Sequence, residues 1–468
     1  MHRHLTFLTL FGSALLLAGL SPAAGQEPSP PAKVTAPLTL PPTKPGGKET
    51  YLPVRIGQVP ADNDFQNPES EFCFKRSKST DHFLMLWAKE YGDDPTANEQ
   101  TNRRFKPDEV LQAAEQSYEV FVNRLKWAPS PTAWANRYKM LIIVTGGSNG
   151  TAYGGSAENK VGVLWTPASR INRGPYGVVA HELGHSFQSL TRADGAEAWT
   201  GSGAFSEMTS QYMLWQVFPE WQTFENYHLK AYLKATHLAF LHPDNQYHTC
   251  YPLEYWSFRH GTEFMGRLWR EGKKAEDPVL TYQRITNINQ NRFNDEMFDA
   301  ARRFVTWDLP RIEKVSARYA DQDTTSLQPT PDGWFRIAPA LAPQNYGYNA
   351  IKLTVPEAGT KVRLTFKGTA GQDGASQVNL DKAGWRYGFL AHLQDGKRDY
   401  SLIYSNPEGT AEYGVPAGTK FLWLVVMGAP TGHWILNEKK DGKAEWPYRI
   451  KFMGTTPDPS IIAPPAGG

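Results

Sequence analysis

Two histidines four residues apart, with a glutamate directly after the first, form the segment of this chain best suited to chemistry. The segment is His181-Glu182-Leu183-Gly184-His185. Residues four apart lie on one face of an α-helix, so both imidazoles can bind one metal ion while Glu182 reaches a water held by that ion. The spacing indicates a zinc-dependent hydrolase with Glu182 as general base. The alternative is a helix that carries two surface histidines.

The residues around this motif favour the helix that it needs. Apolar side chains recur at helical intervals, at Val178, Val179, Leu183 and Phe187. Pro175 suits the first turn of a helix. Gly184 costs about 1 kcal/mol of helix propensity relative to alanine, which indicates a close-packing or access requirement at this position.

A hydrolytic zinc site needs a third protein ligand and an open position for water, and two glutamates downstream are candidates. Glu197 lies in a stretch with Gly and Asp that is typical of a loop, whereas Glu207 opens an expected helix that follows the turn at residues 201–203. A carboxylate on a helix is held more rigidly than one on a loop, so Glu207 is the predicted ligand. Glu207 also suits an ordinary acidic position near a helix N-terminus.

The motif, followed by Ser206-Glu207-Met208-Thr209-Ser210-Gln211-Tyr212, resembles the gluzincin zinc metallopeptidases of the enhancin-like, mucin-degrading type. The resemblance covers roughly residues 137–220. It implies one zinc ion per chain, bound by His181, His185 and Glu207, with Glu182 as the catalytic base. The runs 255–270 and 383–389 are similar to a secreted family of unknown function that has avirulence-labelled members.

Position 211 departs from the family pattern, and the donor to the oxyanion has two candidates. Gln211 stands where many gluzincins place Asp and where the mucin-degrading group tends to have Asn, and its amide can orient a ligand histidine. The loop-like segment 242–252 offers hydrogen-bond donors for the oxyanion, among which His248 and Tyr251 are the expected ones. Such an aromatic segment equally suits the core or its rim.

The first 50 residues predict export and then a linker. A basic start, an apolar run from Leu5 to Leu20 and small residues up to Gly25 are typical of a signal peptide over residues 1–25. No later stretch has the length of a membrane span. Residues 26–50 are rich in Pro and predict an extended linker. The mature chain is therefore expected to be secreted or periplasmic.

Hydrophobic patterning predicts an α+β chain with two domains, a metallopeptidase-like catalytic domain at 51–330 and a β-sandwich at 331–455. In the first, helices are expected at 107–126, around the two zinc-binding segments, and at 221–241, 253–270 and 295–305. Strands are expected there at 138–145 and 161–165, one of which would bind a substrate backbone. In the second, alternating strands are expected at 350–355, 361–366, 388–393 and 420–426. Residues 456–468 are expected to be disordered.

The aromatic residues of the predicted sandwich suit two roles. Platforms for sugars are one possibility, for which the candidates are Trp385, Tyr387, Trp423, His433 and Trp434. Core packing is the other, because aromatic side chains dominate sandwich interiors.

Charge and cysteine content narrow the function classes. The formal net charge is +2 without long runs of one sign, and the chain has no nucleic-acid motif, so nucleic acid is not an expected partner. Cys73 and Cys250 are the two cysteines, and in an exported chain they permit one disulfide.

Two functions are consistent with these sequence features. The first is a secreted zinc endopeptidase that acts on extracellular proteins or glycoproteins. The second is a non-catalytic, secreted glycan- or host-protein-binding factor with a vestigial zinc site. Glu182 favours the peptidase, because a purely structural metal site has no use for a base beside its ligands.

Overall fold

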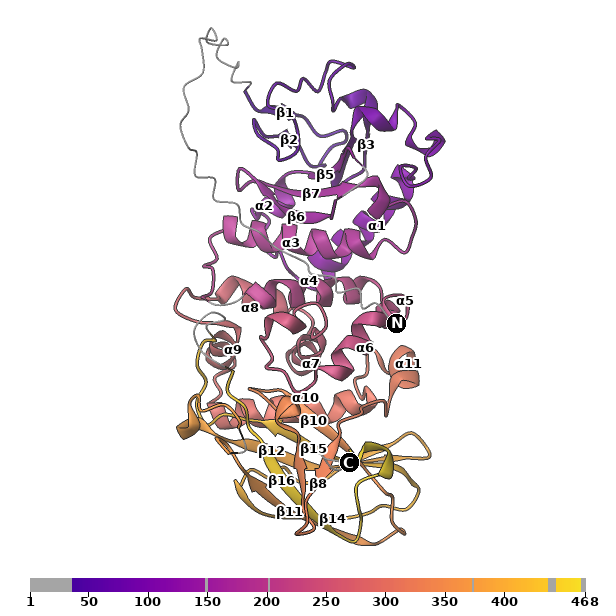
Figure 1. The fold of residues 1–468 in the computed structure, drawn as a ribbon. Helices are drawn as coiled ribbons and strands as arrows, with labels where there is room; N and C mark the ends of the chain where they lie inside the picture. The colour runs from indigo at the N-terminus through magenta and orange to yellow at the C-terminus, as the bar shows by residue number, and fades with distance from the viewer. Residues whose placement is uncertain (1–35, 148–149, 201–202, 373, 437–442, 464–468) are drawn as a thin grey trace, which may run out of the picture.

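Three layers are stacked along the molecule in the computed structural model, which describes residues 36–147, 150–200, 203–372, 374–436 and 443–463 (Figure 1). A mixed sheet lies at one end, helices fill the middle, and a two-sheet β-sandwich forms the other end. The predicted α+β fold with a C-terminal sandwich is confirmed. The predicted signal peptide, residues 1–25, lies outside the described residues.

The first layer is a five-stranded sheet of order β3-β4-β5-β7-β6. Its strands are β3 (Ser77–Ser79), β4 (Phe83–Trp87), β5 (Met140–Thr145), β6 (Tyr153–Ala157) and β7 (Val161–Pro167). The central strands β4, β5 and β7 run parallel and are buried on both faces, which explains their continuous apolar sequences. β6 pairs antiparallel with β7 at one edge.

The expected linker 26–50 is only partly as predicted. Its residues 26–35 lie outside the described residues, but β1 (Leu38–Leu40) pairs antiparallel with β2 (Thr50–Leu52), whose three residues are buried. The Lys48 ammonium group also donates to the Tyr118 hydroxyl at 2.6 Å. The end of the Pro-rich segment is thus part of the folded molecule, because it carries apolar and cationic side chains that find partners.

The middle layer holds the helices. They are α1 (Pro107–Glu119), continued by a π-helical turn at Val120–Arg124, α2 (Trp134–Arg137), α3 (Gly177–Ala193), α4 (Gly203–Val217), α5 (Trp221–Phe224), α6 (Asn226–Lys234), α7 (Tyr251–His260), α8 (Phe264–Glu271), α9 (Pro278–Thr286), α10 (Gln290–Thr306) and α11 (Glu313–Ser316). α3 packs between the first sheet and α4. α4 is buried on nearly every side because α3 and α7 cover it.

Two predicted helices are interrupted for identifiable reasons. The helix expected at 221–241 ends at Lys234, and the chain beyond it is drawn toward the sandwich, where the carbonyls of Thr236 and His237 accept from Tyr348 and Gln344. The helix expected at 253–270 breaks at Gly261, whose φ of 93° is accessible mainly to glycine. These helices end where they do because of long-range hydrogen bonds in one case and one backbone angle in the other. The periodic spacing of apolar residues does not determine these ends.

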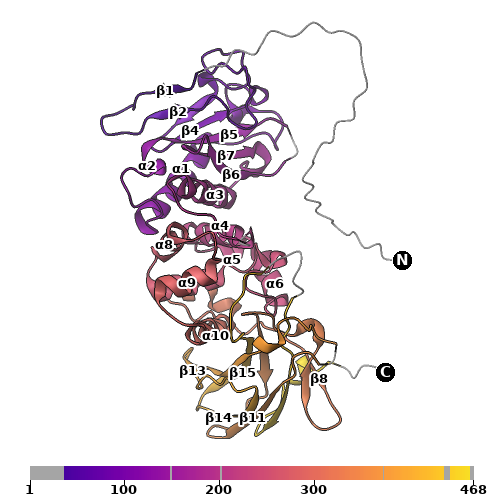
Figure 2. The same ribbon diagram turned by 90° about the vertical axis from the view of Figure 1, so that its left-hand side faces the viewer.

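The third layer is a sandwich of a four-stranded sheet, β10-β15-β12-β13, and a five-stranded sheet, β14-β11-β16-β9-β8. The strands are β8 (Leu327–Pro329), β9 (Phe335–Ile337), β10 (Tyr348–Leu353), β11 (Lys361–Gly368), β12 (Trp385–Leu393), β13 (Arg398–Tyr400), β14 (Glu408–Gly414), β15 (Thr419–Gly428) and β16 (Tyr448–Met453). The four-stranded sheet faces α10 (Figure 1, Figure 2).

The four-stranded sheet is buried on both faces, as β15 illustrates. Leu422, Leu424 and Val426 belong to the core between the two sheets. Trp423, Val425 and Met427 belong instead to the core that fills the helical layer and the first sheet. Alternation along the strand sends successive side chains to opposite faces, so one strand serves both cores. The sandwich and the helices therefore share apolar packing.

Of the two roles considered for the sandwich aromatics, core packing is the one that most of them have. Trp385, Tyr387 and Trp423 are buried, with 3%, 1% and 0% of their surface exposed, so no sugar ring can stack on them. His433 contacts Asp277 at 2.7 Å and the Tyr346 hydroxyl at 2.9 Å. Trp434 is half-buried against the sandwich core. These aromatic residues pack the sandwich and its junction with the helices.

The predicted disulfide is wrong, because Cys73 and Cys250 are both free and buried. Cys73 lies before the short helix Phe74–Arg76, beside the first sheet, and its thiol is 3.9 Å from the Pro68 carbonyl. Cys250 immediately precedes α7 in the helical layer, where burial raises the pKa of its thiol well above the usual value. The two thiols belong to different layers.

The C-terminal segment is ordered further than predicted. Residues 456–463, expected to be disordered, continue along the sandwich: the backbone N–H of Ala463 donates to the Leu327 carbonyl at 2.9 Å. Ile461 is buried with 5% exposure in the sandwich core. An apolar Ile-Ile pair within the Pro-rich tail accounts for this. No helix among the described residues is long and apolar enough to cross a lipid bilayer.

A buried acid at the junction of helices and sandwich gives a stability prediction. Burial, together with the nearby Asp321, raises the pKa of Asp323 from 3.8 to about 7. One carboxylate oxygen of Asp323 has no hydrogen-bond partner within the described residues. Between these two pKa values the unfolded chain releases a proton that the folded chain keeps, so the free energy of unfolding falls as pH rises through this window.

Asp323→Asn is expected to remove this loss, because an amide does not ionise. The variant should exceed the wild type in stability by up to about 4 kcal/mol at pH 8 and by little at pH 4. Thermal unfolding at both pH values measures the difference. Asp62→Asn, at an exposed position, is the matched control and should show no such pH dependence. Equal melting temperatures of Asp323→Asn and wild type at pH 8 would contradict the prediction.

Candidate metal centre

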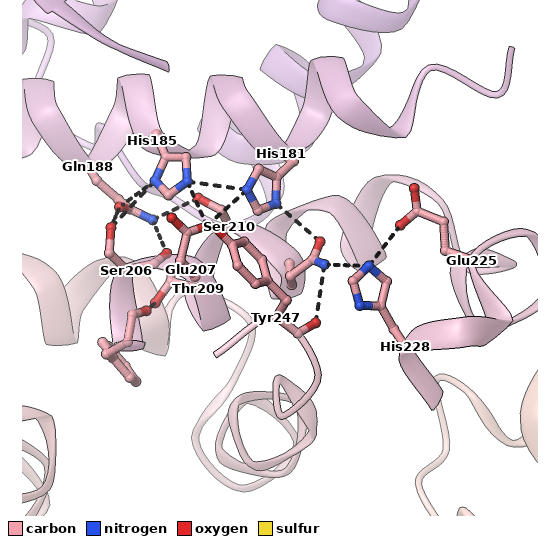
Figure 3. A network of polar contacts seen from close by, with 12 residues as sticks. His181, His185, Gln188, Ser206, Glu207, Thr209, Ser210, Glu225, His228 and Tyr247 are labelled. Carbon is pink, nitrogen blue, oxygen red and sulfur yellow. Dashed lines mark hydrogen bonds and ion pairs between the residues drawn. The ribbon is translucent and has the colours of Figure 1, made fainter. Parts of the chain in front are cut away.

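Helices α3 and α4 bring the predicted metal-binding residues together. Val179, Leu183 and Phe187 on α3 are buried, which directs His181 and His185 toward α4 (Figure 3). The two helices approach closely at Gly184, where an added Cβ would lie 2.9 Å from the Ser210 hydroxyl oxygen and 3.2 Å from Ser210 Cα. The close-packing requirement expected at Gly184 is confirmed.

Three side-chain atoms converge between the helices. His181 Nε2 lies 3.2 Å from Glu207 Oε2, His185 Nε2 lies 3.1 Å from the same oxygen, and the two Nε2 atoms are 3.2 Å apart. Ligands about 2.0–2.1 Å from a tetrahedral zinc lie about 3.3 Å from one another. The spacing of the three atoms therefore fits zinc ligation.

Two glutamine amides determine which nitrogen of each imidazole carries the proton. Gln211 Nε2 donates to the Tyr247 carbonyl at 3.2 Å, so its Oε1 accepts from His181 Nδ1 at 3.1 Å. Gln188 Nε2 donates to the Ser206 carbonyl at 2.9 Å, so its Oε1 faces His185 Nδ1 at 3.2 Å. With the protons on Nδ1, both Nε2 lone pairs point at an already negative carboxylate oxygen. A bound cation would stabilise this convergence of lone pairs and negative charge.

The sequence did not single out Gln188, which lies three residues after His185 and thus on the same side of α3. Its spacing was the only signal available. Glu197, the rejected candidate, is exposed and accepts from the backbone N–H of Lys274 at 2.7 Å. Among the described residues, only His181, His185 and Glu207 form a metal-binding group of three or more His, Cys, Asp or Glu.

The two glutamates of the site have opposite electrostatics. Burial opposes ionisation of Glu207, but the interactions with His181 and His185 outweigh burial and hold the pKa of Glu207 well below its usual range. Burial raises the pKa of Glu182, against the attraction of the two histidines. Glu182 has 8% of its surface exposed and lines the cleft beside His181. An anionic ligand and a more basic neighbouring carboxylate are what hydrolysis at a metal requires.

Strand β6 borders the site through a glycine. A Cβ added to Gly154 would lie 1.8 Å from the Glu182 carbonyl oxygen and 3.0 Å from His185 Cβ, whereas one added to Gly155 would meet only Trp165, at 3.6 Å. β6 can therefore pack against the turn of α3 that carries Glu182 and His185 only if position 154 has no side chain.

Gly154→Ala is expected to push β6 away from α3 and to lower the free energy of unfolding by about 1–3 kcal/mol, as overpacking does. Gly155→Ala, one residue along the same strand, is the matched control and should cost much less. Thermal unfolding of both variants measures this. Equal destabilisation by the two substitutions would show that strand propensity, rather than contact with the motif helix, is what position 154 requires.

Neither predicted oxyanion stabiliser is among the residues that line the cleft. Tyr251 is completely buried among aromatic side chains such as Trp215, with ring centroids 5.4 Å apart. His248 contacts His228 through their Nδ1 atoms, 2.7 Å apart. Tyr247 is the donor that lines the cleft, with its ring centroid 6.3 Å from that of His181. Tyr247 and His248 lie in an irregular segment without a hydrophobic period, and Tyr251 begins α7 directly after it, so the sequence could not rank the three.

The centre lies in a cleft of about 790 Å³. Its walls come from β6, the segment before α3, α4, α6 and the loop of Tyr247. Residues of this cleft that the sequence did not indicate include Tyr153, Arg170, Arg173, Glu225, Tyr227 and His228. They come from segments far apart in the chain, so only the fold reveals their proximity.

A family model described as a family of unknown function (DUF6055) matches residues 42–459. The chain belongs to this family. The match spans both the centre and the sandwich of this DUF6055 protein. No curated protein sequence matches it.

Remote similarities to solved structures accompany this family match. The ZmpB metallopeptidase from Clostridium perfringens shares 14% identity over 80% of this chain and 69% of its own, with a TM-score of 0.30. The M60 catalytic domain of the same ZmpB with two CBM51 domains shares 11% identity over 82% of this chain, with a TM-score of 0.29, and the match spans 60% of that structure. A xylan-binding CBM22 domain from Paenibacillus barcinonensis Xyn10C shares 10% identity over 29% of this chain and 90% of its own, with a TM-score of 0.15. At these values the similarities carry no functional conclusion.

Proposed function

We propose that this DUF6055 protein is a secreted zinc-dependent endopeptidase that hydrolyses peptide bonds of extracellular proteins or glycoproteins. The observation that carries the proposal is the convergence of His181 Nε2, His185 Nε2 and Glu207 Oε2 within 3.1–3.2 Å of one another. A structural metal site needs no base, yet Glu182 lines the same cleft. Export is supported by the sequence of residues 1–25.

The proposed chemistry divides among a few groups. Zinc in such a site lowers the pKa of water to about 7 and polarises a carbonyl oxygen. Glu182 accepts the proton of the attacking water and passes it to the leaving amine, for which its raised pKa suits it. The Tyr247 hydroxyl donates to the oxyanion, and burial raises the pKa of Tyr247 to about 12, so this hydroxyl keeps its proton at neutral pH.

Strand β6 supports the binding of an extended substrate. It is the edge strand of its sheet, and its Tyr153 and Gly154 line the cleft. An edge strand offers backbone N–H and C=O groups to a peptide that adds as a further strand. A peptide that added to β6 would lie alongside α3, next to Glu182.

Metal analysis of the mature protein, paired with a mass-spectrometric cleavage screen of denatured proteins and glycoproteins, tests the proposal. We expect one zinc per chain and cleavage that a chelator abolishes and added zinc restores. Zinc without cleavage of any substrate would favour the alternative, a glycan- or host-protein-binding factor with a vestigial site. Absence of zinc after reconstitution would overturn the ligand assignment.

A further inference from the structure

Two arginine side chains that line the cleft have no ion-pair or hydrogen-bond partner within the described residues. Arg170 ends the short helix Ala168–Arg170, and Arg173 lies four residues before α3. Both are exposed and both line the cleft that contains His181 and Glu182. A guanidinium has five N–H donors and no acceptor, and its fork matches a carboxylate. Two such groups on one cleft wall are a feature that the hydrolytic centre itself does not require.

The acidic residues of the cleft have other partners. Glu207 contacts both ligand histidines, and Glu182 lies beside them. Glu225 accepts from Trp221 Nε1 at 2.6 Å, and burial raises its pKa. Two arginines against three glutamates give the side chains of the cleft a charge of −1, which a divalent cation at the centre changes to +1. Such a cleft attracts acidic groups and selects against basic ones.

An exposed aromatic ring lies in the same part of the cleft. Tyr227 on α6 has 60% of its surface exposed, and its ring lies 4.2 Å from that of His228 between centroids. Desolvation of its hydroxyl and the charge of Glu225 raise the pKa of Tyr227, and the nearby Arg170 guanidinium opposes this rise. An open aromatic surface beside a guanidinium can contact the apolar part of a ligand while the charge is neutralised.

We propose that Arg170 and Arg173 form a subsite that binds an acidic group of the substrate, a carboxylate near the scissile bond. The inference rests on the proposed peptidase function and specifies its substrate class. The carboxylate belongs either to an Asp or Glu side chain or to an acidic sugar on a glycopeptide. Both present the same charge and geometry to the two guanidinium groups.

The test uses full-length, zinc-loaded protein and peptides of one core sequence. Each position near the scissile bond carries Glu, Gln or Lys in turn, and two further peptides carry one O-linked glycan with or without a carboxylated sugar. The wild type should favour an acidic over the matching neutral peptide about tenfold in kcat/KM, and this ratio should fall to about 1 in Arg170→Ala/Arg173→Ala. Arg104→Ala, at an exposed position outside the cleft, should keep the wild-type ratio.

The outcomes separate the subsite from the peptidase function. Preference for Glu or for the acidic sugar, lost in the double variant, supports the subsite and identifies the source of the carboxylate. Cleavage without any acidic preference overturns the subsite and leaves the peptidase function standing. If no peptide is cleaved, the peptidase function fails, and calorimetric titration with the Glu and Gln peptides decides the subsite: tighter binding of the Glu peptide, lost in the double variant, supports it, and equal binding overturns it.

Discussion

Glu182→Gln is expected to lower kcat/KM for peptide hydrolysis by about 10²–10⁴-fold, the usual contribution of a general base. Gln has nearly the shape of Glu but cannot accept a proton at neutral pH. Because Glu182 is buried and is not among the three converging ligand atoms, the variant should keep its zinc and its melting temperature.

Kinetics with one defined peptide, zinc content and thermal unfolding measure this prediction together. Glu197→Gln is the matched control, since Glu197 is a nearby exposed acid that caps the backbone N–H of Lys274 instead. It should retain wild-type kcat/KM. Undiminished hydrolysis by Glu182→Gln would exclude Glu182 as the base, and loss of zinc in this variant would make its activity uninterpretable as a measure of proton transfer.

Glu207→Gln is expected to weaken zinc affinity by at least about 100-fold, because the loss of an outer hydrogen-bond partner alone typically costs 10–100-fold. The substitution removes the anionic atom that lies 3.1–3.2 Å from both histidine Nε2 atoms. It leaves two neutral ligands, too few for a hydrolytic zinc site. Competition with a chromogenic chelator measures the affinity.

A series of variants with graded effects makes the measurement of zinc affinity more discriminating. Gln211→Leu keeps all three ligands and removes only the amide that faces His181 Nδ1 at 3.1 Å, so it should lie between Glu207→Gln and the wild type. Glu197→Gln should bind zinc as the wild type does. A Glu207→Gln variant with unchanged affinity would mean that the third ligand lies elsewhere.

The sequence was sufficient for the parts of the centre that depend on helical spacing. His181 and His185 meet because four residues make about one helical turn, and the buried apolar residues of α3 determine which way they face. Glu207 joined them because its helix carries no Gly or Pro after residue 203 and α4 packs along α3. Local period and short separation in the chain make such contacts predictable.

The contacts that the sequence could not rank arise between irregular segments. Tyr247, His248 and Tyr251 lie within five residues, yet Tyr247 faces the cleft, His248 contacts His228, and Tyr251 is fully buried. Their directions depend on the turn before α7, which has no repeating pattern. Likewise, Arg170 and Tyr227 come from segments on opposite sides of α3 and α4 in the chain, and only tertiary packing places them in one cleft.

The role of the sandwich aromatics stayed open in the sequence for a different reason, since aromatic side chains suit both sugar platforms and core packing. Trp423 illustrates this: its ring is fully buried and its Nε1 donates to Asp321 at 2.9 Å. The sequence shows an aromatic residue on a strand but not whether another layer covers that face. Here α10 and the segment after it cover the four-stranded sheet.

The double burial of β15 makes the sandwich a poor candidate for a detachable module. A chain cut near residue 330 would expose the apolar faces of α10 and its neighbours, which Trp423, Val425 and Met427 now cover. The isolated sandwich would expose those same three side chains to water. Each half would therefore be prone to aggregate, unlike domains that are joined only by linkers.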